Sequence, residues 1–499
     1  MSTLTALARA QAVARQIAQP ACTVRHVHVA ERPLVFIPLA LAGEANAPLA
    51  ALVGDDPGSP RLLVVTQPRN RDQRFAFAAA LAEVVVGYVE AFCSATETVP
   101  SGPGRDPRRR FAEAPQILVP NPAGIRFVRL LGRSTRFRRA FGQYAVDPAV
   151  PVLGRWLTFL ADRAEVPGSC LLLAATDALA LHWASGQSRV EDLNLAALLG
   201  WIDPPRGMTG PQAAAAAEDA VRWPPAGPAT DPAFDNEVLG PLIAACARAE
   251  GGDPGALRRA ESALENALSG QLTPTWGLMW RAVGLLRALP PGALVPARWG
   301  ADKDTFTRYV DYLREGGPPQ PRRDSAVAAA RRLDRLERAL AGYTAQRAMD
   351  DPLVMAEYRM TGEAFAGIVT AAEPGRIDGT GRRRRLRPQI TVATEDPLRI
   401  EAGDALRSPG RRGQSAVVVS VSAGRPCEVV LELSGGMGRA LTPAAGSVPA
   451  VGDLVCYTTL SDSYQPPGSF PSREDTPWTH GGPPPEYVPA DEDANEVWS

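Results

Sequence analysis

The chain has 499 residues, 45% hydrophobic and 21% charged, a composition that suits an ordinary globular protein of about three domains. Its net charge of −1 excludes a uniform polycation, so any surface for nucleic acid must be a local patch. The 53 basic residues include a single lysine, Lys303. This arginine bias is typical of a high-GC bacterium and offers a non-functional explanation for every arginine cluster.

Six cysteines are scattered along the chain without a CxxC pair, which argues against a disulfide scaffold or a zinc knuckle and fits reduced thiols. The first 21 residues predict a short amphipathic helix and not a signal peptide. No stretch reaches the roughly 18 uninterrupted apolar residues that a membrane span needs. We therefore expect a cytoplasmic protein without a membrane partner.

Residues 1–148 predict a small α/β domain. The segment TVRHVHV (23–29) alternates with period two, and we expect it to pair as a hairpin with RPLVFIPLAL (32–41). The further elements are a strand at 61–68, a helix at 69–92, a strand at 115–120 and a strand or helix at 124–132.

Residues 149–320 predict a helical domain, because apolar residues recur at helical spacing between Pro/Gly breaks. We expect one helix in SCLLLAATDALALHWASG (169–186) and two separate helices at 256–270 and 274–289. Residues 321–375 predict a long helical stalk, in which a charged amphipathic helix at 324–349 is followed by helix 351–372.

The remaining chain predicts a basic linker at 376–388, a small β-barrel at 389–460 and a disordered acidic tail at 461–499. Five short apolar segments separated by turn residues favour the barrel. The tail is rich in proline, glycine and acidic residues and poor in aliphatic ones. The expected fold class is multidomain α+β: an N-terminal α/β part, a helical middle with stalk helices, and the barrel.

The sequence lacks the motifs of several classes of enzyme. A single lysine without a GxxxxGK sequence excludes a phosphate-binding P-loop, and the strand lysine of protein kinases is also missing. There is no HExxH zinc-hydrolase motif and no GxSxG serine-hydrolase motif. We therefore predict no catalytic residue, no cofactor and no metal site.

Two weaker candidates for metal chemistry remain open. His26 and His28 would lie on one face of a strand, but an i, i+2 pair is more often simply two surface or half-buried histidines. Asp55 and Asp56 precede a strand that carries Gln67, an arrangement similar to a degenerate metal-dependent nuclease core. The DDPGSP sequence is equally well explained as a turn.

Positive charge is concentrated in two zones. Residues 105–139 hold ten arginines and two acids, and residues 376–439 hold twelve arginines and seven acids, whereas residues 461–499 hold eight acids and one arginine. Arginine can form bidentate hydrogen bonds to phosphate, and an aromatic ring can stack on a base. The predicted nucleic-acid contacts are Arg133, Arg136, Phe137, Arg138, Arg139, Arg382, Arg383, Arg384, Arg385 and Arg387.

The C-terminal third carries a partial resemblance to a known family. Charged helices and a basic segment are followed by LRIEAGDALRSPGRRGQSAVVVSV and VGDLVCYTTL. This order resembles the stalk-and-barrel insertion of superfamily 1 helicases of the nonsense-mediated-decay type. The resemblance covers residues 324–460 and implies a barrel that lies against nucleic acid or a partner. The motor motifs are absent, so the resemblance implies at most an accessory of such an enzyme.

These observations lead to one hypothesis and two alternatives. We expect a non-catalytic protein that binds DNA or RNA, or that docks a separate helicase or nuclease onto it. The alternatives are a protein–protein interaction scaffold, in which the arginines are merely solvated, and a degenerate metal-dependent nuclease that uses Asp55 and Asp56.

Overall fold

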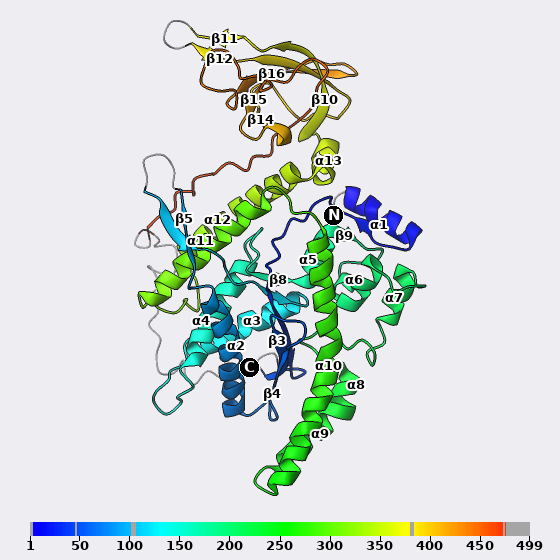
Figure 1. The fold of residues 1–499 in the computed structure, drawn as a ribbon, viewed down its shortest axis with the longest axis vertical. Helices are drawn as coiled ribbons and strands as arrows, with labels where there is room; N and C mark the ends of the chain where they lie inside the picture. Colours follow the sequence, from blue (N-terminus) through cyan, green and yellow to red (C-terminus); the bar gives the residue numbers. More distant parts are fainter. Residues whose placement is uncertain (1–2, 45–46, 101–105, 380–383, 473–474, 476–499) are drawn as a thin grey trace.

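The computed structural model describes residues 3–44, 47–100, 106–379, 384–472 and 475. It confirms the predicted multidomain α+β fold, with an N-terminal mixed sheet, a helical middle and a C-terminal β-barrel. The sheet and most helices form one body, and the barrel stands at one end of it, beyond helix α12 (Ala326–Asp350) (Figure 1).

A five-stranded mixed sheet in the order β4-β3-β2-β7-β8 lies inside the body. Its strands are β2 (Leu34–Ala40), β3 (Pro48–Gly54), β4 (Arg61–Val64), β7 (Ile117–Val119) and β8 (Leu172–Ala174). β2 pairs antiparallel with β3 and parallel with β7. Every residue of β2 is buried, as expected for a continuous apolar run in a strand covered on both faces.

The predicted hairpin between residues 23–29 and β2 is wrong. Residues 23–29 form no strand, and β2 pairs with β3 instead. The backbone N–H of His26 donates to His182 Nε2 at 2.9 Å, and that of His28 donates to Cys170 Sγ at 3.2 Å. Because side chains take up these donors, they are not available for a strand ladder.

Helices cover the sheet and share its core. The main ones are α2 (Arg71–Ala91), α3 (Pro122–Thr135), α4 (Ala149–Ala164), α10 (Pro254–Ala288) and α11 (Val295–Arg314). One hydrophobic core contains buried residues from Val27 to Val310, so the segments 1–148 and 149–320 are packed around a common interior. Residues 124–132, predicted as strand or helix, are helical, and the Asn121 side chain caps this helix by accepting from the N–H groups of Ala123 and Gly124.

Two expectations for the helical middle are wrong. Residues 169–186 form strand β8, helix α5 (Ala175–His182) and strand β9 (Trp183–Ala184) rather than one helix. The two helices expected between 256 and 289 are the single helix α10, which has Pro274 in its interior. A proline removes one hydrogen bond, and the packing of a long apolar face against the core offsets that loss.

The body also contains shorter elements. They are α1 (Thr3–Arg15), α6 (Leu195–Ile202), α7 (Gly210–Ala216), α8 (Pro232–Phe234), η2 (Asp235–Leu239), α9 (Gly240–Ala249), η1 (Glu191–Leu193), β1 (Gln19–Pro20), β5 (Thr96–Val99) and β6 (Arg108–Phe111). β1 pairs with β9, and β5 pairs with β6.

The chain enters the barrel earlier than predicted. Helix α13 (Pro352–Thr361) ends at Gly362, whose φ of 85° is left-handed, and strand β10 (Ala364–Glu373) follows. The expectation of a helix to residue 372 is therefore wrong, and the β-branched Ile368, Val369 and Thr370 fit the strand better.

β10 supplies the sixth strand of a closed antiparallel barrel, in the order β10-β13-β16-β15-β14-β17. The others are β13 (Gln389–Thr394), β14 (Ala405–Arg407), β15 (Ser415–Val421), β16 (Cys427–Ser434) and β17 (Leu454–Thr458), with η4 (Pro409–Arg411) between two of them. Phe365, Leu431 and Tyr457 are among the side chains that fill its interior.

The segment expected as a basic linker is a hairpin. β11 (Ile377–Asp378) pairs with β12 (Arg385–Leu386) and continues the β10–β13 pair beyond the barrel wall (Figure 1). Residues 380–383, between the two short strands, lie outside the described part of the chain.

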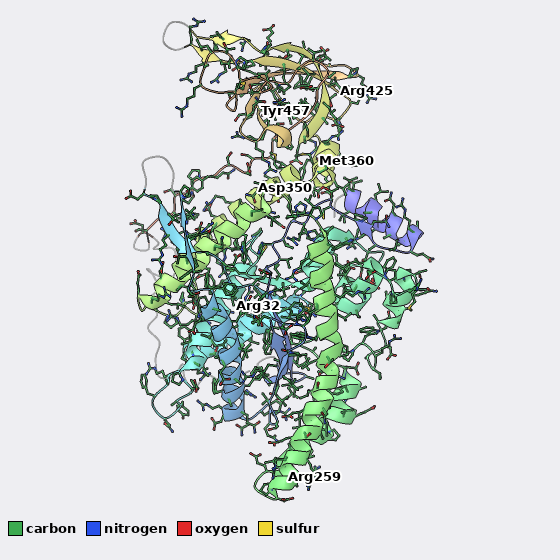
Figure 2. The ribbon with its side chains drawn as sticks, viewed as in Figure 1. Arg32, Arg259, Asp350, Met360, Arg425 and Tyr457 are labelled. Atoms are coloured by element: carbon green, nitrogen blue, oxygen red, sulfur yellow. The ribbon has the colours of Figure 1, made fainter. Side chains whose placement is uncertain are left out.

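Asp350 joins the body to the barrel (Figure 2). Its buried carboxylate accepts from the N–H of Leu294 at 3.0 Å and from Arg412 Nη2 of the barrel at 2.6 Å. No helix in the described part of the chain is both long and apolar enough to cross a membrane.

Candidate nucleic-acid interface

The predicted contacts at the end of α3 divide into exposed and buried side chains. Arg133 is exposed and Arg139 is half-buried. Arg136, Phe137 and Arg138 are only 3%, 7% and 5% exposed. In this conformation the last three side chains do not reach the surface, so they do not offer the phosphate and base contacts predicted for them.

Close packing of α3 on α4 explains this burial. A Cβ placed on Gly154 would lie 2.3 Å from the backbone N of Arg136, and one on Gly132 would lie 2.7 Å from the backbone N of Thr158. The two glycines therefore allow the helix backbones to approach closely, and the residues that follow α3 are drawn inward.

The buried side chains have structural partners. Arg136 Nε donates to the carbonyl oxygen of Gln320 at 2.9 Å, and its Nη2 donates to that of Pro321 at 3.1 Å. The Phe137 ring lies 4.6 Å from the Arg136 guanidinium and 5.5 Å from that of Arg322. These contacts fix the chain that leads from α11 into α12.

Arg133 faces a groove of about 740 Å³ between α3, α4 and the first half of α12. Arginine is the prevailing residue in its walls, with eight arginines against three acids. The charged lining residues are Arg129, Arg133, Arg136, Arg322, Arg323, Arg331, Arg332, Arg335, Asp162, Glu165 and Asp324.

Ion pairs hold part of this charge in place. Arg129 contacts Glu165 at 2.6 Å, and Arg332 contacts Glu165 as well as Asp324 at 3.4 Å. Burial raises the pKa of Asp162 above its ordinary value, although the nearby Arg332 lowers it. Each acid of the groove thus has an arginine at ion-pair distance, including Asp162, which lies 3.7 Å from Arg332.

Four arginines of the groove remain available for an anion. Within the described residues, Arg133, Arg323, Arg331 and Arg335 have no carboxylate at ion-pair distance. All four side chains are exposed, so each can form a bidentate contact without leaving a buried partner. Several exposed arginines without a carboxylate partner among the described residues, gathered in a concave surface, are the arrangement expected for binding several phosphates.

An apolar cavity of about 700 Å³ adjoins the groove. Leu41, Phe127 and Leu130 contribute to its walls, and Arg129 and Arg133 line both spaces. The two arginines therefore separate a charged surface from an apolar one.

The second predicted zone lies elsewhere in the molecule. Arg384 and Arg385 are exposed on the β11–β12 hairpin, at the end of the barrel remote from the body (Figure 1). Arg387 is half-buried and lies 3.6 Å from Glu432, which also binds Arg376 at 2.6 Å. Arg382 and Arg383 lie outside the described residues.

Residues 459–472, which follow β17, return toward the groove. After β17 the chain runs back along α12 (Figure 1), where Arg338 Nη1 donates to the carbonyl oxygen of Gln465 at 3.3 Å. Arg338 lies one helical turn beyond Arg335 and pairs with Asp334 at 2.8 Å. The segment that precedes most of the acidic residues is thus placed beside the groove.

Other basic and acidic candidates have local partners. Arg108 forms a bidentate pair with Asp304, and Lys303 binds Glu97 at 2.8 Å. Asp55 pairs with the exposed Arg32 at 2.7 Å, and the exposed Asp56 accepts from the N–H of Gly58 within its turn.

The nuclease alternative requires Asp55 and Asp56 to converge with a further carboxylate, and the described residues show no such group. Their one group of three His, Cys, Asp or Glu donors does not include Asp55 or Asp56. The weaker alternative, a metal shared by His26 and His28, is not seen in the described residues either: the one group of donors does not include His28, whose ring stacks on Trp299 at 4.0 Å.

Sequence reasoning missed the α12 side of the groove. It identified a charged amphipathic helix at 324–349 but assigned no binding role to its arginines. The signal was available, because Arg331 and Arg335 are four residues apart and so share one helix face. That this face meets α3 depends on the tertiary fold.

Comparison with known proteins identifies no relative. No family model, no curated protein and no solved structure matches the chain.

Proposed function

We propose that this chain is a non-catalytic nucleic-acid-binding protein whose main binding surface is the arginine groove between α3, α4 and α12. The observation that carries the proposal is the convergence of four exposed arginines from three segments, none with a carboxylate partner in the part of the chain that the structure describes: Arg133, Arg323, Arg331 and Arg335. Codon bias explains why the residues are arginines, but it does not explain why they converge.

The features of the groove favour a nucleic-acid backbone over a small anion. The groove is lined by residues of α3, α4, α12 and the segment that leads into α12, and the arginines without a carboxylate partner among the described residues come from three of these four. The adjoining apolar cavity offers space for an unstacked base, which favours a single strand.

The stalk and barrel support a role as an accessory of a nucleic-acid enzyme. A long helix, a short second helix and a six-stranded barrel follow in the order of the stalk-and-barrel insertion of superfamily 1 helicases. By that resemblance the barrel and its arginine hairpin would contact nucleic acid or a separate helicase or nuclease.

The proposal is tested by fluorescence anisotropy with labelled single- and double-stranded DNA and RNA over a range of salt concentrations. We compare the wild type with Arg323→Ala/Arg331→Ala/Arg335→Ala. Each phosphate contact contributes about −0.7 to the slope of log affinity against log salt for single strands, so the triple variant should flatten it by about 2.

A matched control removes the same charge from the far end of the body. Arg248, Arg258 and Arg259 are exposed on α9 and α10, and Arg259 is labelled in Figure 2. Their triple alanine variant should keep the wild-type slope. Equal slopes in all three proteins would overturn the groove assignment, and no binding at low salt would favour the protein-interaction scaffold.

A further inference from the structure

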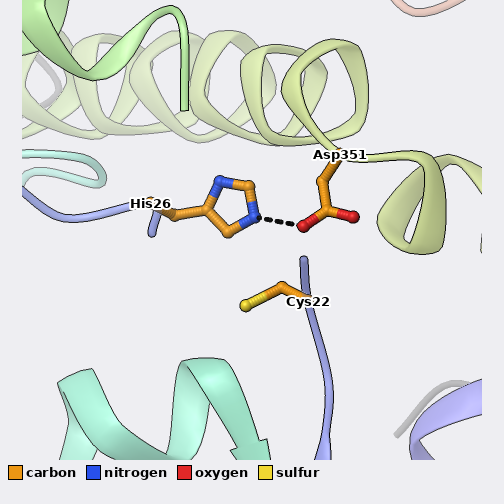
Figure 3. A group of neighbouring side chains, drawn as sticks. All are labelled: Cys22, His26 and Asp351. Atoms are coloured by element: carbon orange, nitrogen blue, oxygen red, sulfur yellow. Dashed lines mark ion pairs between the residues drawn. The ribbon is translucent and has the colours of Figure 1, made fainter. Parts of the chain in front are cut away.

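Three potential metal ligands meet where the body joins the stalk (Figure 3). Cys22 and His26 belong to the irregular segment between β1 and β2, and Asp351 lies between α12 and α13. One donor atom from each, a thiol sulfur, an imidazole nitrogen and a carboxylate oxygen, lie within 4.8 Å of one another. All three residues are buried, at 3%, 0% and 1% exposure.

The His26 imidazole lacks the partners that a buried ring requires. Within the described residues, neither Nδ1 nor Nε2 forms a hydrogen bond, although both are shielded from solvent. Its nearest opposite charge is Asp351 Oδ2, which lies 3.4 Å from Nε2 (Figure 3). A buried polar group without a hydrogen bond costs free energy, so its retention calls for an explanation.

The distance between the His26 nitrogen and the Asp351 oxygen suits two ligands of a tetrahedral ion. With bonds of about 2.0 Å to nitrogen and oxygen, two ligands of a tetrahedral zinc ion are about 3.3 Å apart. The observed 3.4 Å from His26 Nε2 to Asp351 Oδ2 is close to that edge. Cys22 Sγ has a long contact of 3.8 Å to the carbonyl oxygen of His182 and a hydrogen bond with the backbone of Val24, both of the weak kind that a thiol forms.

Hydrogen bonds fix the Asp351 carboxylate in place. It accepts from Thr23 N at 2.6 Å, Thr23 Oγ1 at 3.0 Å, Leu353 N at 2.9 Å and Val24 N at 3.2 Å. The long Val24 contact at Oδ2 is the one that a metal bond would most readily replace.

We propose that Cys22 Sγ, His26 Nε2 and Asp351 Oδ2 form a structural zinc site. The thiol loses its proton to solvent as the Zn–S bond forms, and a water molecule or the second carboxylate oxygen takes the fourth position. The mixed sulfur, nitrogen and oxygen donors suit zinc better than Mg²⁺ or Ca²⁺, which prefer oxygen ligands only.

Burial distinguishes this site from a catalytic one. A cysteine, a histidine and an aspartate can also act as nucleophile, base and orienting group, but that chemistry requires access for a substrate. The complete burial of His26 provides none in this conformation. A structural ion binds as the chain folds and would join the N-terminal segment to the start of α13.

The test measures zinc in the full-length chain after dialysis against metal-free buffer. One zinc ion should remain per chain in the wild type and in Cys246→Ser, a buried cysteine of α9 outside the site. Cys22→Ser and His26→Gln should lose it. Replacing zinc with Co²⁺ should give a thiolate-to-cobalt absorption band that disappears in Cys22→Ser.

A chelator series keeps the test decisive if a variant folds poorly. A strong chelator should lower the thermal midpoint of the wild type, and added zinc should restore it. Absence of bound zinc in the wild type, together with a midpoint that responds to neither reagent, would overturn the proposal. Nucleic-acid binding is measured separately and does not depend on this outcome.

Discussion

Arg136 and Arg331 line the same groove but differ in their surroundings. Arg136 is 3% exposed and donates to two backbone carbonyls of the segment that leads into α12. Arg331 is exposed on α12. One arginine therefore shapes the groove, and the other provides charge to it.

This difference predicts that substitution of Arg136 changes stability, whereas substitution of Arg331 changes binding. Arg136→Ala removes charge-assisted hydrogen bonds from a buried site and should lower the free energy of unfolding by about 1–3 kcal/mol. Arg331→Ala should change it by less than about 0.5 kcal/mol while weakening binding. Urea unfolding and anisotropy on the same samples check both effects. Equal stability losses would contradict the assigned roles.

Residue identity alone could not separate these roles. RFRR at 136–139 has the composition of a nucleic-acid contact, and all four residues are predicted as such contacts from the sequence. Their burial follows from the approach of α3 to α4 through Gly132 and Gly154, which are far apart in sequence. The exposure of Arg133 and of Arg384 agrees with the expectation, although their binding role stays a prediction.

At the scale of elements, an ion pair connects α13 to the barrel. Arg359 donates to Asp396 at 2.7 Å from Nε and 3.0 Å from Nη2, and the N–H of Ala366 in β10 donates to Asp396 at 2.8 Å. The carboxylate thus connects the last turn of the stalk to the first barrel strand.

Substitution of Asp396 should loosen this junction. Asp396→Asn should lower stability by about 1 kcal/mol, a modest figure because Arg359 is 40% exposed. Hydrogen exchange should accelerate in residues 364–373 and not in the body. The neighbouring, exposed Glu395→Gln is the control.

The same pair has a defined pH dependence. Burial alone would raise the pKa of Asp396, but Arg359 and the N–H of Ala366 more than offset it, so the pKa is lowered. A lowered carboxyl pKa stabilises the folded state above the ordinary value of about 3.9, and this contribution is lost as pH falls through the folded value. The free energies of unfolding of the wild type and of Asp396→Asn should therefore differ at pH 7 and converge in acid.

Local signals predicted most elements but not their partners. The sequence predicted five of the six barrel strands and missed β10. This strand follows a helix directly, and its sequence, AFAGIVTAAE, contains four alanines, which favour a helix over a strand. The left-handed Gly362 marks the change. The pairing of β2 with β3 instead of residues 23–29 depended on buried side-chain contacts that periodicity does not reveal.

At the scale of the whole molecule, the two basic zones lie on different parts of the chain. The groove is in the body, and the arginine hairpin is at the far end of the barrel (Figure 1). α12 connects them, and its 25 residues span roughly 37 Å at 1.5 Å per residue. A short oligonucleotide would therefore engage the groove alone, and the hairpin would add affinity only for longer strands.

The path of the C-terminal segment suggests that it competes with nucleic acid. Residues 461–499 hold eight acids and one arginine, and Gln465 contacts Arg338 beside the groove. Removing residues 461–499 should tighten binding, most strongly at low salt, because the competing contacts are electrostatic. Anisotropy of the full-length and shortened chains measures the difference, with Arg331→Ala/Arg335→Ala in both backgrounds. If the tail competes for these arginines, its removal should matter less in the double variant; an unchanged gain would place the competition elsewhere.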